Sequence, residues 1–197
     1  MSTTTDVTVH SVADVPWDDV RTVFGTRGDP SGCWCQYFKL PNATFESATK
    51  DECAGMLRQQ VQANDPAPGV IAYLDGEPVG WCALEPRTHY DRLRRSTIVS
   101  GGSNEDPDDA SVWAVICFVV RVGYRKRGVS GALLRGAVEQ ARVLGARVIE
   151  GYPVDTTVRM KAPSAELYHG TLSLFMAAGF EIVSRPTRDR VVVRQAL

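Results

Sequence analysis

The sequence predicts a mixed α/β fold, in which one β-sheet carries helices on both faces. Three observations predict it. The chain alternates segments of a two-residue apolar period with segments of a helical period. Residues 111–122 (SVWAVICFVVRV) are almost continuously apolar, which is typical of a strand buried on both faces. A helical pattern separates this strand from the next one, so the two are expected to be parallel.

The first third of the chain predicts one strand and two helices. Residues 6–12 (DVTVHSV) alternate apolar and polar side chains, as a strand does. Residues 17–24 repeat apolar positions at helical spacing, and the following TRGDPSG ends that helix with Gly and Pro. A second helix is expected over residues 47–64, with Ser47 as its N-cap.

A hairpin follows, with strands over residues 70–74 and 78–84 joined by a turn at DGE. Residues 86–110 show no sustained period; the first half is basic and the second is acidic. We expect a long surface loop with at most one helical turn. Loops of this length are more often functional than idle.

The second half of the chain predicts the centre and the far edge of the sheet. After the apolar strand, a helix is expected over residues 130–144 and its parallel strand over 146–154 (ARVIEGYPV). A short helix follows around residues 171–178. Residues 180–184 and 191–197 predict closing antiparallel strands.

Composition bounds the class of protein. With 197 residues and 44% hydrophobic content, the chain predicts a single domain over residues 1–197. Lys and Arg (22) nearly balance Asp and Glu (23), so neither nucleic acid nor a membrane is an expected partner. The N-terminal residues lack a signal-peptide pattern, and we expect a cytoplasmic protein.

The five cysteines are odd in number and irregularly spaced, which argues against a disulfide framework. Cys33 and Cys35 in the CWC segment match metal-site spacing poorly, so no metal is expected there. Aromatic packing of Trp34 and Tyr37 explains the segment better. Cys117 lies in the apolar strand, where a thiol is expected to be buried and inert.

The turn RKRGVSGA, residues 125–132, joins the central strand to the following helix. Open N–H groups and the positive dipole end of a helix can hold a phosphate there, and glycine permits the approach. Equally, the two glycines can serve turn geometry alone while the basic side chains are solvated. The turn is neither a Walker motif nor GxGxxG.

This turn resembles the pyrophosphate-binding motif (Gln/Arg)-x-x-Gly-x-(Gly/Ala) of the GNAT superfamily of acyl-CoA N-acetyltransferases. Arg125, Gly128 and Ser130 occupy its three positions, with Ser130 departing from Gly or Ala. The segments GEPVGWCAL and TLSLFMAAGFEIV are also similar to the family's hairpin and its last helix and strand. The resemblance covers most of the chain and is to members of an actinobacterial type.

The resemblance implies the GNAT fold: a twisted, mostly antiparallel sheet whose central parallel strand pair splays apart. It also implies acetyl-CoA as cofactor. Pantetheine would lie along the central strand, and main-chain N–H groups of the turn would hold the pyrophosphate. The implied cofactor-binding residues are Val119, Val120, Arg125, Arg127, Gly128, Val129, Ser130, Gly131 and Ala132.

For catalysis, the resemblance implies that the backbone N–H of Cys117 faces the acyl carbonyl. The tyrosine that commonly protonates the thiolate is replaced by Phe175, so Tyr168, Ser173 or a water takes its place. A strand glutamate used by some members is replaced by Trp113. Glu150, an acid in an apolar strand, is the preferred general base, unless it merely ends a strand and faces water.

Weaker candidates for the base are Glu85, His89, Asp109 and Asp155. An apolar acceptor wall is expected from Trp34, Tyr37, Phe38 and Tyr152, unless these belong to the core. The acidic run NEDPDD can attract a cation or be a solvated loop, and we favour the latter.

The resemblance implies direct transfer of acetyl from acetyl-CoA to a primary amine of a small molecule or protein. The alternative is a catalytically weak GNAT-fold acyl-CoA-binding or regulatory module. A homodimer is a further expectation, since GNAT proteins often dimerise.

Overall fold

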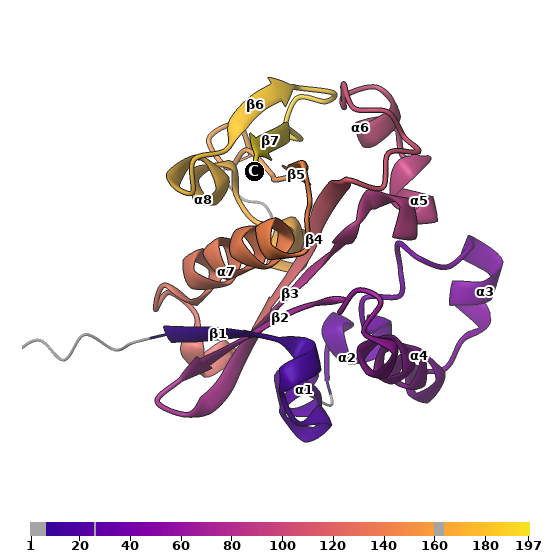
Figure 1. The fold of residues 1–197 in the computed structure, drawn as a ribbon, viewed down its shortest axis with the longest axis vertical. Coiled ribbons are helices and arrows are strands. Elements are labelled where there is room, and N and C mark those ends of the chain that lie inside the picture. Colours follow the sequence, from indigo (N-terminus) through magenta and orange to yellow (C-terminus); the bar gives the residue numbers. More distant parts are fainter. Residues whose placement is uncertain (1–6, 26, 160–163) are drawn as a thin grey trace, which may run out of the picture.

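The computed structural model describes residues 7–25, 27–159 and 164–197, and in this part of the chain a seven-stranded sheet forms the centre (Figure 1). The strand order is β1-β2-β3-β4-β5-β7-β6. The strands are β1 (Val7–Ser11), β2 (Gly69–Leu74), β3 (Glu77–Pro86), β4 (Val112–Val120), β5 (Val148–Gly151), β6 (Glu181–Ser184) and β7 (Val192–Ala196). Among these seven strands, β4 and β5 are the pair that runs parallel, as predicted from the helix between them.

The helices lie on both faces of the sheet, which confirms the predicted fold class. They are α1 (Trp17–Phe24), α2 (Asp29–Cys33), α3 (Asn42–Ser47), α4 (Lys50–Ala63), α5 (Asp91–Arg94), α6 (Thr97–Ser100), α7 (Val129–Val143) and α8 (Leu172–Ala177). Figure 1 shows α7 on one side of the central strands and α1, α2 and α4 on the other. One apolar cluster packs α7 and α8 on the sheet, and a second packs α1 and α4 on the opposite face.

The helix over residues 17–24 ends before the TRGDPSG segment, as predicted, but the N-terminal helices differ from expectation in two ways. Part of the TRGDPSG segment forms the further helix α2, because Gly28 at φ 80° turns the chain and Pro30 suits the first turn of a helix. Ser47 ends α3 and does not cap α4. The N-cap of α4 is Thr49, whose hydroxyl and the Glu52 carboxylate form a reciprocal capping box.

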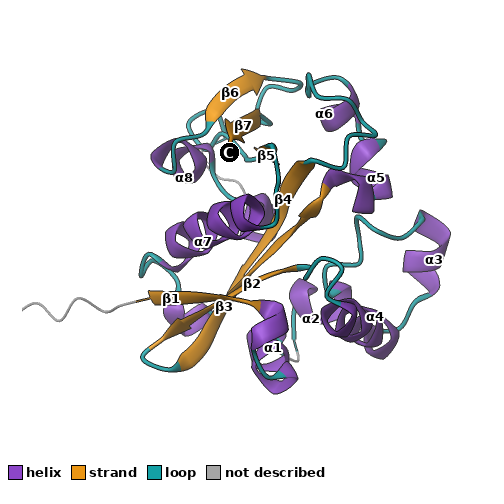
Figure 2. Cartoon of the chain, in the orientation of Figure 1, coloured by secondary structure: helices purple, strands orange, loops and turns teal. Residues whose placement is uncertain are grey.

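The segment between β3 and β4 is more ordered than the predicted loop. It forms η2 (Arg87–His89), α5 and α6, which Figure 2 shows as short helices joined by loops. Arg87 and Tyr90 are fully buried. The start of the segment is therefore anchored in the core, whereas most of residues 91–111 are exposed or half-buried, as expected for a surface segment.

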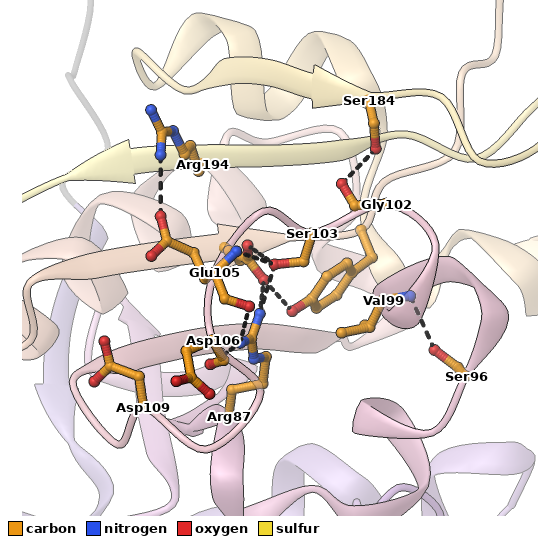
Figure 3. Close-up of polar contacts among 12 residues, drawn as sticks. Arg87, Ser96, Val99, Gly102, Ser103, Glu105, Asp106, Asp109, Ser184 and Arg194 are labelled. Atoms are coloured by element: carbon orange, nitrogen blue, oxygen red, sulfur yellow. Dashed lines mark hydrogen bonds and ion pairs between the residues drawn. The ribbon is translucent and has the colours of Figure 1, made fainter.

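A buried ion pair ties this segment to β5. Arg87 Nη1 donates to Glu150 Oε2 at 2.8 Å and to the Ser103 hydroxyl at 2.7 Å, while Nη2 donates to the Asp106 carbonyl at 2.6 Å (Figure 3). The Ser103 and Tyr152 hydroxyls donate to Glu150 at 2.6 and 2.8 Å. Both charged side chains are 0% exposed, so each depends on the other for compensation.

The strands β4 and β5 pair over only four residues, from Val112↔Val148 to Val115↔Gly151. At the next residue the register with β3 shifts, from Leu84↔Val115 to Ala83↔Cys117, so Ile116 forms a β-bulge. As a result Ile116 and Cys117 both face the second apolar cluster, which interrupts the normal alternation of a strand. Beyond the bulge, β4 continues to Val120 without β5 beside it.

We predict that Glu150→Ala lowers the free energy of unfolding by about 3–5 kcal/mol, because it leaves the Arg87 charge buried and uncompensated. The double variant Arg87→Met with Glu150→Leu should lose less than the sum of the two single changes. Urea unfolding measures both. Glu181→Ala, at an exposed position of β6, is the control. A loss for Glu150→Ala as small as that of Glu181→Ala would contradict the prediction.

Candidate active site

The turn between β4 and α7 presents open backbone N–H groups. After η3 (Val122–Tyr124), Gly128 at φ 80° leads into α7, and no side chain caps this helix within the described structure. A Cβ at Gly128 would meet no described atom within 4 Å. The first turn of α7 therefore offers its N–H groups and the positive end of its dipole to an anion.

Three basic residues of this turn, Arg125, Lys126 and Arg127, are exposed. None of them forms an ion pair with any residue that the structure describes. Their charge is available to an anionic ligand, which favours the phosphate cradle over turn geometry alone.

The remaining predicted cofactor residues continue along the same path. Val119 and Val120 form the end of β4, and the Val120 carbonyl accepts a hydrogen bond from Arg125 Nε at 3.3 Å. The side chains of Val129 and Ala132 are buried in the first apolar cluster or at its edge, so these residues can offer a ligand only their backbone. Ser130 and Gly131 are half-buried in the first turn of α7.

The bulge places Cys117 beside the CWC segment. The Cys117 thiol is half-buried, not buried as predicted, because the bulge turns it toward the α1 face. The nearby Cys117 thiol and burial together raise the pKa of the Cys35 thiol well above its usual value. No group of three or more potential ligands is placed to hold a metal ion among the described residues.

The CWC segment also packs aromatically, as predicted for Trp34. Its ring stacks on Phe24 at 4.7 Å and on Trp17 at 5.8 Å between ring centroids. Of the expected acceptor wall, Trp34 and Tyr152 belong to the core, whereas Phe38 is half-buried and Tyr37 is 40% exposed.

Glu150 does not lie in an open site. Its side chain is 0% exposed, and both of its oxygens accept hydrogen bonds within the Arg87 network. A general base must reach the proton that it removes. The interpretation of Glu150 as that base does not fit this geometry, and the opposite expectation, that Glu150 faces water, is wrong as well.

The weaker acidic candidates also have partners. Glu85 pairs with Lys39 and His89, Asp109 with Arg147, and Asp155 with Arg185. The acidic run is not simply solvated, because Glu105 binds Arg147 and Arg194 and Asp108 binds Arg94 (Figure 3 shows the pair with Arg194).

Tyr168 lies where β4 and β5 diverge. It ends η4 (Ser164–His169) together with His169, and it lines a pocket together with Arg190. Burial raises the pKa of Tyr168 to about 12, so the hydroxyl keeps its proton at neutral pH. Phe175, at the usual tyrosine position, is 0% exposed and packs against Phe118 and Phe180.

Sequence reasoning missed His169 as a residue of this site. It is 3% exposed, its ring centroid lies 5.5 Å from that of Phe38, and its element η4 packs against β4. Burial lowers the pKa of His169 to about 3, so the ring is neutral at neutral pH. No periodicity or motif marks it, because only the fold brings it to the bulge.

A family model described as Acetyltransferase (GNAT) family matches residues 34–169. The chain belongs to this family, and it is therefore an acetyltransferase of the class that uses acetyl-CoA. No curated protein matches it in sequence.

Solved structures show the same fold at low identity. A ribosomal-protein-alanine N-acetyltransferase from Brucella melitensis matches with TM-score 0.56 and 15% identity, over 96% of this chain and 99% of that one. A GCN5-related N-acetyltransferase from Kribbella flavida matches with TM-score 0.52 and 17% identity, over 97% and 98%. The paia N-acetyltransferase from Thermoplasma acidophilum, in complex with coenzyme A, gives 0.54 and 10%, over 98% and 99%.

The described helices include none with the length and apolar character that a membrane span needs.

We predict that Gly128→Glu weakens coenzyme A binding by roughly 100-fold, because the new carboxylate fills the open turn and repels the phosphates. Gly145→Glu is the matched control. Gly145 has φ 82°, has no described neighbour within 4 Å of a Cβ, and follows the other end of α7. Calorimetry should show an unchanged affinity for this control. Equal affinities of the two variants would contradict the assignment of the turn.

We also predict that His169 makes stability depend on pH. The unfolded chain binds a proton on this ring below about pH 6.5, whereas the folded protein does so only near pH 3. The free energy of unfolding therefore falls as pH drops below about 6.5, by at most about 1.4 kcal/mol per pH unit from this group.

Urea unfolding between pH 4.5 and 7.5 tests this dependence. His169→Phe should remove that part of the slope, and His10→Gln, on an exposed position of β1, should leave it intact. An identical slope in wild type and His169→Phe would show that His169 does not contribute.

Proposed function

We propose that this protein transfers an acetyl group from acetyl-CoA directly to a primary amine of a small molecule or a protein. One observation carries the proposal. The strand β4 runs from the bulge at Ile116, where it leaves β5, to Val120, and η3 and a short turn then join it to the open N-terminus of α7. The proposed phosphate site thus follows directly after the strand that bears Cys117, and η4 with Tyr168 packs against the same strand.

Acetyl-CoA supplies the acetyl group as a thioester. Its phosphates would be held by the backbone of residues 128–132 and by the Arg125 and Arg127 side chains. Its pantetheine arm would be oriented by Val119 and Val120 of β4. The Cys117 N–H is the proposed donor to the acyl oxygen.

The Tyr168 hydroxyl is the proposed proton donor, in place of the position that Phe175 occupies. It keeps its proton at neutral pH because burial raises its pKa to about 12. For the base we name no carboxylate, since the acidic candidates are ion-paired. The rate of acetyl transfer should then rise with pH as the acceptor amine loses its proton.

We further propose that the chain forms a single domain, because its two apolar clusters lie on the two faces of one sheet. Residues 1–6 lie outside the described part. A cytoplasmic location and a homodimer remain predictions from the sequence.

Turnover tests the proposal. The protein is incubated with acetyl-CoA and polyamines, aminoglycosides, amino acids or lysine peptides, while thiol release and product mass are followed. We expect an acetylated amine above the hydrolysis background. Tyr168→Phe should lower the rate by roughly 100-fold and leave coenzyme A affinity unchanged. Tight binding of coenzyme A without any acetylated product would instead favour the acyl-CoA-binding module.

A further inference from the structure

A cavity of about 300 Å³ lies beside the point where β4 and β5 diverge. It is formed by Val154 after β5, by η4, and by the segment that precedes β7. Its polar lining consists mainly of two arginines, two acids and the pair Tyr168 and His169. The volume is sufficient for a small metabolite.

Both acids of this cavity bind the same arginine, and the other arginine binds neither. Arg159 binds both acids, donating to Asp189 at 3.0 Å and to Glu166 at 2.9 Å. Arg190 has no carboxylate within ion-pair distance among the residues described. Its Nη2 donates to the Tyr152 carbonyl at 2.9 Å, and its Nε is buried without a hydrogen-bond partner in the described structure. A guanidinium with an unused donor thus lines the cavity.

A second polar group in the cavity also lacks a partner. The His169 side chain is 97% buried, since only 3% of it is exposed, and its Nδ1 has no hydrogen-bond partner in the described part of the chain. Buried polar atoms without partners are rare and require an explanation. A ligand with hydrogen-bonding groups would satisfy both Arg190 and His169.

The cavity adjoins the proposed site of acetyl transfer. Tyr168 and His169, whose ring centroids lie 4.1 Å apart, both line it. Both belong to η4, which packs against β4. A ligand held by Arg190 would therefore lie beside Tyr168, on the side of η4 that adjoins β4.

We propose that the acceptor is an amine that also carries a carboxylate, such as an amino acid, and that Arg190 binds this carboxylate. The proposal rests on the proposed acetyltransferase function and names the substrate class of that site. A planar guanidinium matches a carboxylate in shape and charge. A polyamine, in contrast, has no carboxylate for Arg190 to bind and would add positive charge beside its guanidinium.

Matched substrate pairs test the proposal. Each of the common L-amino acids is compared with its own carboxamide, which keeps the amine and the side chain but removes the negative charge. We expect at least one pair in which kcat/KM for the acid exceeds that for the amide by about 10- to 100-fold. A general preference for the amides, or for polyamines, would overturn the proposal.

Variants of the chain identify the anchor. Arg190→Gln should bring the ratio of kcat/KM for the acid to kcat/KM for the amide close to one. Arg190→Lys should retain part of this preference, since Lys keeps the charge but cannot donate two parallel hydrogen bonds to a carboxylate. Arg188→Gln is the control, because it removes the same charge from an exposed neighbour outside the cavity. A ratio that Arg190→Gln leaves unchanged would overturn the role of Arg190.

A binding measurement separates this inference from the activity itself. Calorimetry without acetyl-CoA compares the N-acetyl amino acid of the preferred pair, or N-acetylglycine if no pair turns over, with its amide. Wild type should bind the acid more tightly, and Arg190→Lys should reduce the difference even if Arg190→Gln does not fold. Carboxylate-dependent binding without turnover would contradict the proposed function but support the anchor. Turnover of amines without carboxylate-dependent binding would support the proposed function but contradict the role of Arg190.

Discussion

The four-residue pairing between β4 and β5 is the constraint on which the site depends. Parallel strands normally continue side by side, but the bulge at Ile116 ends this pairing after Val115. The bulge also turns Cys117 to the same face as its predecessor, toward Cys35. A single inserted residue therefore coincides with the end of the β4–β5 pairing and turns the half-buried Cys117 toward the α1 face of the sheet. The segment with Tyr168 and His169 packs against β4 at this point.

The buried pair of Arg87 and Glu150 holds the other side of the gap. Burying two charges is costly, and such pairs are weak contributors to net stability. This pair, however, joins the segment after β3 to the middle of β5, and Ser103 and Tyr152 complete its hydrogen bonds. An apolar replacement could pack as well without fixing where β5 ends. We therefore attribute to this pair the position of β5 relative to β4.

Local patterns predicted the elements whose cause is local. The helix over residues 17–24, the hairpin and the parallel strand pair follow from periodicity and turn chemistry, and the open turn at Gly128 follows from a motif. Contacts between distant residues were beyond such reasoning. Glu150 was recognised as unusual in an apolar strand, yet its partner Arg87 lies 63 residues away, in a segment without periodicity. His169 and Arg190 likewise meet only through the fold.

The replacement at Phe175 follows from how the last helix packs. A Cβ at Gly151, the last residue of β5, would lie 2.2 Å from the Phe175 ring, so this ring fills the space beside the end of β5. Phe118 and Phe180 enclose it further. A hydroxyl on this ring would be surrounded by apolar atoms and cost desolvation energy. Phe175 of α8 therefore serves core packing. The half-buried Tyr168 of the adjoining η4 supplies the hydroxyl beside β4 instead.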